Sequence, residues 1–205
     1  MKRHTFLLTV SASVAVAAAL AASAASAATT VDVTVYNGYD DNGAGMTFSG
    51  PPAATGSFST APTGFDYNWN NPGSIGGFNA SDVFSADFRG TIIAAAAGTY
   101  TINLGSDDAA YLFVNNVLAA SDGGAHSYNP SDFTITLNKG VNDFEIQYGN
   151  VFCCGAEVSL ETVSPGFSIA GVPEPATWAL MLGGIGLVGA GLRSNRRKLP
   201  LAVPA

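Results

Sequence analysis

The chain has 205 residues, of which 47% are hydrophobic and 11% are charged, and its formal net charge is -7. Eight Lys and Arg residues are too few for a nucleic-acid surface, and two His residues leave little material for a histidine-based zinc or catalytic site. The hydrophobic fraction argues against an intrinsically disordered chain. The 24 Gly and 10 Pro residues favour a loop-rich, mostly β protein.

The N-terminus has the parts of a secretory signal peptide. A basic start is followed by an apolar run over residues 6–22 and then by small residues. Ala25 and Ala27 occupy the small-residue positions of a cleavage site, so we predict a signal peptide over residues 1–27. The mature chain would then work outside the cytoplasm. The alternative is an uncleaved membrane anchor.

The body between the two terminal signals is strongly acidic. Residues 28–172 contain only two basic residues, Arg89 and Lys139, and fourteen acidic ones, which gives a net charge of -12. Such a surface repels nucleic acid and anionic membranes, and it favours divalent cations. Solubility of a secreted protein is the alternative reason for the acidity.

The body contains repeated short segments in which apolar and polar residues alternate, as in half-buried strands. The predicted strands are residues 31–36, 83–93, 98–104, 110–114, 117–119, 133–137, 141–148 and 156–162. No segment has a helical period, so we predict an all-β sandwich or barrel. Residues 39–79 are rich in Gly, Pro, Ser, Thr and Asn, and we interpret them as long loops held to the core by single aromatic side chains.

The most informative segment is residues 98–116. A Gly-Thr-Tyr strand leads to a Ser-Asp-Asp loop at residues 106–108, and an apolar strand then ends in an Asn-Asn turn. This pattern resembles the centre of the protective-antigen (PA14) domain family, a β-sandwich found in bacterial toxins, glycosidases and fungal adhesins. The resemblance implies an antiparallel β-sandwich of protective-antigen type over residues 28–164, followed by a linker over residues 165–172.

The same resemblance implies a metal site. In lectin-like members of the family, two consecutive Asp residues, often joined by a cis peptide bond, bind Ca²⁺ with an Asn from a second loop, and sugar hydroxyls ligate the ion directly. Asp107 and Asp108 match the Asp pair, and Asn150 matches the Asn by its place before a Gly-Ala strand start. Ca²⁺ is then the implied cofactor and a polysaccharide or other glycan the implied partner. The alternative is a loop in which the Asp residues only cap backbone amides.

Cys153 and Cys154 are adjacent, and they are the only cysteines of the chain. No third thiol is present to pair with them in an oxidising compartment, so we predict a vicinal disulfide. Two free thiols or an intermolecular bridge are the alternatives. With Val151 and Phe152, the rigid apolar ring would offer a surface for stacking on a sugar beside the ion.

Other candidate residues are weaker. The run Asp-Asp-Asn-Gly at residues 40–43 resembles part of a Ca²⁺ loop but lacks the distant Glu of an EF-hand, so we interpret it as a turn. His126 is expected to be exposed. Glu145 and Glu157 lie on predicted strands and could form a glycosidase pair, although nothing in their spacing demands it. The chain has no G-x-S-x-G, H-E-x-x-H or phosphate-loop motif, and we predict a non-enzymatic protein.

The C-terminal segment begins with Pro173, Glu174 and Pro175 and continues with the uncharged residues 176–192. That length is the lower limit for a single transmembrane helix. The cations that follow it, and that keep this end cytoplasmic, are Arg193, Arg196, Arg197 and Lys198. Residues 199–205 form a tail without a clear signal.

The order of parts over residues 173–198 resembles the PEP-CTERM sorting signal. The resemblance implies a substrate of exosortase, a membrane transpeptidase that cuts near the Pro-Glu-Pro motif, and an association with exopolysaccharide and biofilm. A simple single-span anchor is the alternative.

These expectations combine into one functional prediction. The chain is exported, held in the membrane by its C-terminal helix with its body facing the periplasm, and then displayed at the cell surface or released outside the cell after processing. Its domain binds carbohydrate in a Ca²⁺-dependent manner. The alternatives are a structural biofilm-matrix protein that binds other proteins without sugar or metal, and a small glycoside-acting enzyme.

Overall fold

Strands account for nearly all of the regular secondary structure. The computed structural model describes residues 29–71, 73–151 and 154–170. In chain order its elements are β1 (Thr29–Asn37), β2 (Ala54–Thr60), β3 (Gly64–Asn68), the short 3₁₀ helix η1 (Ile75–Gly77), β4 (Phe84–Ala94), β5 (Gly98–Asp107), β6 (Ala109–Val114), β7 (Val117–Asp122), β8 (Ser131–Leu137), β9 (Gly140–Asn150), β10 (Glu157–Thr162) and β11 (Phe167–Ala170).

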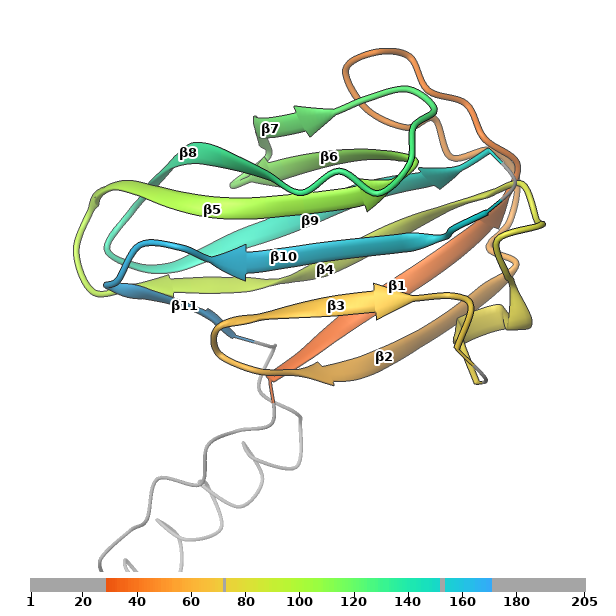
Figure 1. Cartoon of the computed structure of the whole chain (residues 1–205). Helices are drawn as coiled ribbons and strands as arrows, with labels where there is room; N and C mark the ends of the chain where they lie inside the picture. Colours follow the sequence, from red (N-terminus) through yellow and green to blue (C-terminus); the bar gives the residue numbers. More distant parts are fainter. Residues whose placement is uncertain (1–28, 72, 152–153, 171–205) are drawn as a thin grey trace, which may run out of the picture.

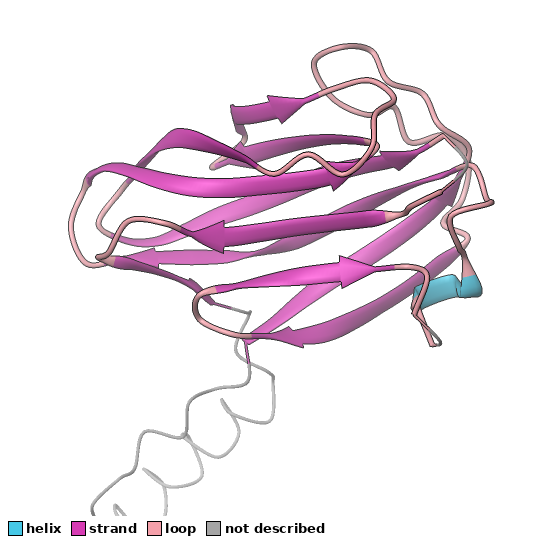
Figure 2. Cartoon of the chain, in the orientation of Figure 1, coloured by secondary structure: helices cyan, strands magenta, loops and turns pink. Residues whose placement is uncertain are grey.

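The strands form two antiparallel sheets that lie face to face, as Figure 1 and Figure 2 show. The larger sheet has the order β2-β1-β4-β9-β6-β7, and β11 also pairs with β4; the smaller sheet has the order β3-β10-β5-β8. All pairings are antiparallel among the described residues. The prediction of an all-β sandwich is therefore confirmed.

The core lies between the sheets and is built from the alternate residues of each strand. On β4, Phe84, Phe88 and Ile92 are fully buried, whereas Arg89 is exposed on the outer face. An aromatic group anchors one end of the core, where Trp69 stacks on Tyr148 with their ring centroids 4.9 Å apart. Because Tyr148 is two residues from the end of β9, this packing also fixes the end of that strand.

Both ends of the described chain lie on one edge of β4. β1 pairs with the first half of β4, up to Arg89, and β11 pairs with the second half from Thr91 onward. The first and last described residues are therefore close together, as the lower part of Figure 1 shows.

Residues 39–79 are not only loops, which corrects the interpretation made from composition. They contain β2, an edge strand paired with β1, and β3, an edge strand paired with β10. β2 was not predicted from the sequence, because this strand consists of small residues apart from one large apolar side chain, Phe58, and so shows no apolar alternation. The predicted role of the aromatic residues is confirmed, since Phe65 and Trp69 belong to the core and Phe58 and Tyr67 pack against it.

The predicted linker over residues 165–172 is also corrected, because Phe167–Ala170 forms β11. Ile169 is buried and donates its backbone N–H to the Pro62 carbonyl at 2.9 Å, and the Phe167 ring packs edge-on against Tyr100. The sandwich therefore continues to Ala170.

The predicted terminal signals fall outside the described residues. These are the signal peptide over residues 1–27, the sorting motif and anchor over residues 173–198, and the tail over residues 199–205. Within the described part of the chain, no helix is both long enough and apolar enough to cross a bilayer.

The contact between Gly90 and Phe144 gives a test of the core. A Cβ added to Gly90 would lie 2.6 Å from Phe144 Cε1, and the Phe144 side chain is buried in the core. We expect Gly90→Ala to lower the free energy of unfolding by about 1–3 kcal/mol in urea denaturation. Gly98→Ala is the matched control, because the atom nearest to its Cβ, in Tyr100, is 3.9 Å away. Equal stability of the two variants would contradict this packing.

Candidate functional site

The Asp107–Asp108 pair lies at the step between the two sheets. Asp107 ends β5 in the smaller sheet, and β6 of the larger sheet begins at Ala109. The peptide bond between the two Asp residues is cis. Both residues are largely buried, with 9% and 6% of their surfaces exposed.

Backbone N–H groups from two loops hold the two carboxylates. From the β7–β8 loop, His126 donates to Asp108 Oδ1 at 2.9 Å and Tyr128 donates to Asp107 Oδ2 at 3.2 Å. From the loop after β9, Val151 donates to Asp108 Oδ2 at 2.8 Å. Main-chain groups thus orient the carboxylates. The amino-acid sequence could not reveal these contacts, because every residue type except proline carries the same backbone N–H group.

Asn150 brings a third oxygen to this place. The register that pairs Ala109 with Gly149 puts Asn150 beside Asp108 at the end of β9. Its amide nitrogen donates to the Asp82 carbonyl at 2.6 Å, which fixes the orientation of the amide. Its Oδ1 atom is buried and has no hydrogen-bond partner. A buried acceptor without a donor is costly unless a ligand satisfies it.

The electrostatics of the pair are unfavourable without a counter-charge. Burial, followed by the charge of Asp108, raises the pKa of Asp107 above its usual value. Among the described residues, no three His, Cys, Asp or Glu side chains form a metal-binding group. The donor set here consists of two carboxylates and one amide oxygen, and such hard oxygen ligands fit Ca²⁺, which fills its remaining positions with carbonyls, water or ligand hydroxyls.

The second predicted loop is only partly described. Val151 is half-buried, Cys154 is exposed, and Phe152 and Cys153 lie outside the described residues. Cys154 is disulfide-bonded, and its backbone has a φ of 78°. The pairing with Cys153 stays a prediction. Gly155 lies directly against the Asp107 carboxylate, so a Cβ at this position would overlap it.

Three weaker sequence candidates have clear outcomes. The turn at residues 40–43 is confirmed, because Gly43 donates its backbone N–H to Asp41 Oδ1 at 2.8 Å. His126 is half-buried and not exposed as expected, since its Nε2 atom lies 3.5 Å from Asp122 Oδ1. The hydrogen bond from its backbone N–H to Asp108 places its loop against the carboxylate pair.

Glu145 and Glu157 lie on different sheets and cannot form a catalytic pair. On β9 the neighbours of Glu145 are buried in the core, and on β10 the same holds for Val158 next to Glu157. Both carboxylates therefore point outward, from opposite sides of the sandwich. Glu145 is bound to Arg89, and Glu157 accepts a hydrogen bond from Asn68 at 2.6 Å.

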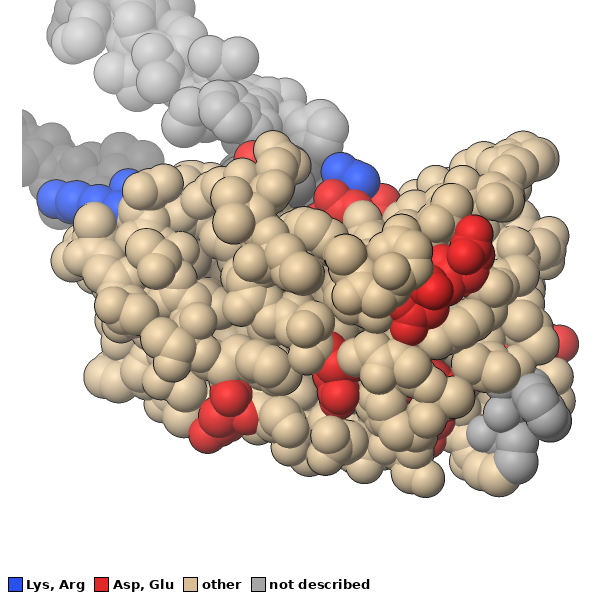
Figure 3. Space-filling model, turned by 90° about the horizontal axis from the view of Figure 1, so that it is seen from above, with Lys and Arg blue, Asp and Glu red and all other residues tan. Residues whose placement is uncertain are grey.

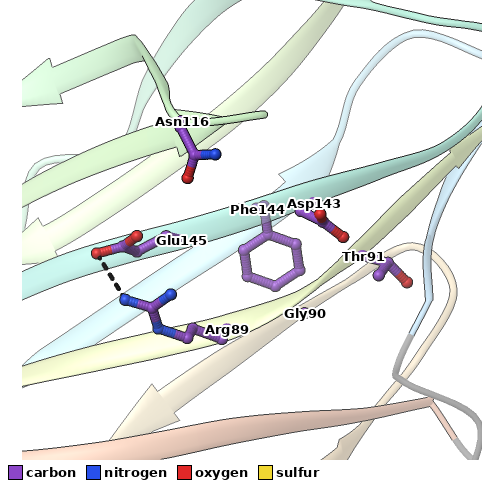
Figure 4. Close-up of a pocket in the computed structure, with 7 residues that line it drawn as sticks. All are labelled: Arg89, Gly90, Thr91, Asn116, Asp143, Phe144 and Glu145. Carbon is purple, nitrogen blue, oxygen red and sulfur yellow. Dashed lines mark ion pairs between the residues drawn. The ribbon is translucent and has the colours of Figure 1, made fainter.

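A separate open groove of about 210 Å³ lies on the outer face of the larger sheet (Figure 4). It is lined by Arg89, Gly90, Thr91, Asn116, Asp143, Phe144 and Glu145. The guanidinium of Arg89 lies 3.2 Å from Glu145 and 2.7 Å from Asp87. Its charge is already balanced within the chain, so we place the candidate site at the Asp pair.

The molecule is an acidic antiparallel β-sandwich with a polar site at one end of its strands. Figure 3 shows acidic side chains spread over the face seen from above, with the basic groups confined to one side of it.

A model of the PA14 domain matches residues 33–151, and the chain belongs to the PA14 domain family. A PEP-CTERM protein-sorting motif matches residues 171–198. No curated protein is similar enough to match the chain.

Similar solved structures include a PA14 sugar-binding domain from an RTX adhesin, with 20% identity, a TM-score of 0.47 and coverage of 71% of this chain and 96% of that one. The PA14 domain of the antifreeze protein MpAFP has 14% identity and a TM-score of 0.48 over 70% of this chain and 91% of that one. An anti-sigma factor domain-containing protein has 17% identity and a TM-score of 0.48 over 71% of this chain. The match spans only 46% of that longer chain.

Asp87 gives a pH test of the outer sheet face. Burial raises the pKa of Asp87 from 3.8 to about 6, against the hydrogen bond from Arg89. The folded protein therefore keeps a proton that the unfolded chain has lost, and stability falls as the pH rises from about 4 to about 6. We expect Asp87→Asn to remove this loss, worth about 3 kcal/mol, in urea unfolding across this pH range.

Asp143→Asn is the control for this experiment, because Asp143 is an exposed carboxyl on the same face. It should keep the wild-type dependence on pH. An unchanged pH dependence in Asp87→Asn would show that Asp87 titrates normally.

Proposed function

We propose that this PA14 domain is a non-enzymatic binding module that holds Ca²⁺ at Asp107, Asp108 and Asn150 and binds a glycan through the ion. The observation that carries the proposal is the buried, unpaired Oδ1 atom of Asn150 beside two buried carboxylates. A bound Ca²⁺ ion would satisfy all three groups and leave coordination positions for sugar hydroxyls. The chain's own part is to hold the two carboxylates with backbone N–H groups and the Asn150 amide with the Asp82 carbonyl.

The sorting motif supports an exported location. We propose that the leader over residues 1–27 directs export, and that the motif at Pro173, Glu174 and Pro175 presents the chain to exosortase. The segment over residues 176–192 then anchors it in the membrane before processing, with the cationic cluster after it on the cytoplasmic side. After processing, the domain works at the cell surface or in the extracellular biofilm matrix. The family match to a protein-sorting motif at residues 171–198 is consistent with this route.

Titration calorimetry with Ca²⁺ tests the metal. We expect binding heat for the wild-type protein and at least a roughly tenfold weaker affinity for Asp108→Asn, because one carboxylate ligand is lost. Asp132→Asn, which neutralises an exposed carboxyl on β8, should bind as the wild type does. No binding heat in the wild type, or equal heat in Asp108→Asn, would remove the metal from the proposal.

A glycan array with and without EDTA tests the ligand. We expect binding to one class of polysaccharide that is lost with EDTA and restored by excess Ca²⁺. Binding that persists in EDTA would contradict the role of the ion. No glycan binding, together with capture of matrix proteins, would favour the structural matrix protein instead.

Gly155 offers a test that changes no proposed ligand. A Cβ at this position overlaps the Asp107 carboxylate. We expect Gly155→Ala to displace the carboxylate and weaken Ca²⁺ binding about tenfold or more in the same calorimetric assay. Wild-type affinity in this variant would show that Asp107 does not need its observed position.

A further inference from the structure

The Asp41 carboxylate joins two loops that are far apart in the sequence. Within the β1–β2 loop it accepts the N–H of Gly43 at 2.8 Å and the hydroxyl of Tyr39 at 3.1 Å. From outside this loop it accepts the hydroxyl of Tyr111 on β6 at 2.5 Å and the N–H of Gly124 at 2.9 Å. A half-buried carboxylate with four donors forms a strong junction, because hydrogen bonds to a charged group are about twice as strong as neutral ones.

The pKa of Asp41 agrees with this geometry. Burial alone would raise it, but the hydrogen bonds from Tyr111 and from the backbone outweigh burial and lower it. The group is therefore an ionised acceptor at neutral pH, and it uses both of its oxygens.

The contact with Gly124 leads to the carboxylate pair. Gly124 is the second residue of the β7–β8 loop and has a φ of 85°, a conformation that glycine adopts readily. Two and four residues later, His126 and Tyr128 donate the N–H groups that hold Asp108 and Asp107. Asp41 thus anchors the start of the loop whose backbone orients both carboxylates.

The contact with Tyr39 leads to the third proposed ligand. The Tyr39 ring packs over Gly149, where an added Cβ would lie 2.7 Å from its Cδ2 and Cε2 atoms. Gly149 directly precedes Asn150, the residue with the unpaired amide oxygen. The β1–β2 loop therefore approaches the proposed ligands at two places, and the Asp41 carboxylate is hydrogen-bonded to the residue that makes each approach, Tyr39 or Gly124.

We infer that Asp41 is a positioning residue that couples the β1–β2 loop to the Asp107, Asp108 and Asn150 site, through Gly124 on one side and Tyr39 on the other. The consequence for ligand binding rests on the proposed function, whereas the mechanical coupling does not. Asp41 is not one of the three proposed ligands. It acts by keeping the β7–β8 loop in the conformation that points its N–H groups at the carboxylates.

Residue-resolved amide exchange without metal tests the coupling. In Asp41→Asn we expect exchange of the Gly124, His126 and Tyr128 amides to speed up by about tenfold or more, because the loop loses its anchor. The Val151 amide, which binds Asp108 from the other loop, should keep its protection. Asp40→Asn is the matched control, since Asp40 is the exposed neighbour and the change in charge is the same.

A second variant and a calorimetric measurement extend the test. Tyr111→Phe keeps the ring in its apolar cluster but removes one of the four donors, so it should shift the same amides by a smaller factor. In calorimetry with Ca²⁺, Asp41→Asn should bind about tenfold more weakly than the wild type, and Asp40→Asn should not differ.

The outcomes separate the two ideas. Unchanged exchange at His126 and Tyr128 in Asp41→Asn, or an equal rise at Val151, would overturn the coupling whatever the metal does. The wild-type protein could fail to bind Ca²⁺ while Asp41→Asn still exchanges faster at the three loop amides. That result would uphold the coupling and remove only the metal from the proposed function.

Discussion

The antiparallel pairing of β4 with β9 is the constraint on which the structure depends. The two strands pair along their full lengths, from Phe84 with Asn150 to Ala94 with Gly140. Every other strand of the larger sheet is attached to this pair, with β1 and β11 on one side and β6 on the other. Because the ladder ends at Asn150, it also decides where the amide of that residue lies.

The candidate site shows how a sandwich can bury charge. Asp107 and Asp108 stand where the chain passes from one sheet to the other, so burial comes with the topology. Three backbone N–H groups offset part of the desolvation of the carboxylates, and the oxygen of Asn150 is left unpaired. The fold itself orients these three side chains, because each of them is hydrogen-bonded to the main chain. The same topology places Glu145 and Glu157 on opposite outer faces of the sandwich. The two residues therefore cannot form the catalytic pair that was considered from their residue types.

Most of the fold was predictable where strands have one clear apolar face. β5, β8 and β9 show period-two alternation and were predicted close to their observed limits. β2 was not, because a Gly- and Ser-rich edge strand has little to bury and resembles a loop in composition. β11 was taken as a linker, since four residues are too few for a periodic signal and its stability comes from pairing with β4.

The sequence by itself determined the class of protein, the acidic body and the residue types of the site, because alternation, charge and short motifs are local properties. It also predicted a signal at each end of the chain, and of these a PEP-CTERM protein-sorting motif is matched at residues 171–198. Only the tertiary structure decided that Asn150 keeps an unpaired oxygen, that backbone groups of the β7–β8 loop hold the carboxylates, and that Asp41 anchors this loop. The physical reason is that these contacts join side chains to main-chain groups far away in the sequence, as the Gly124 N–H joins the Asp41 carboxylate, and such pairs leave no local pattern in the sequence.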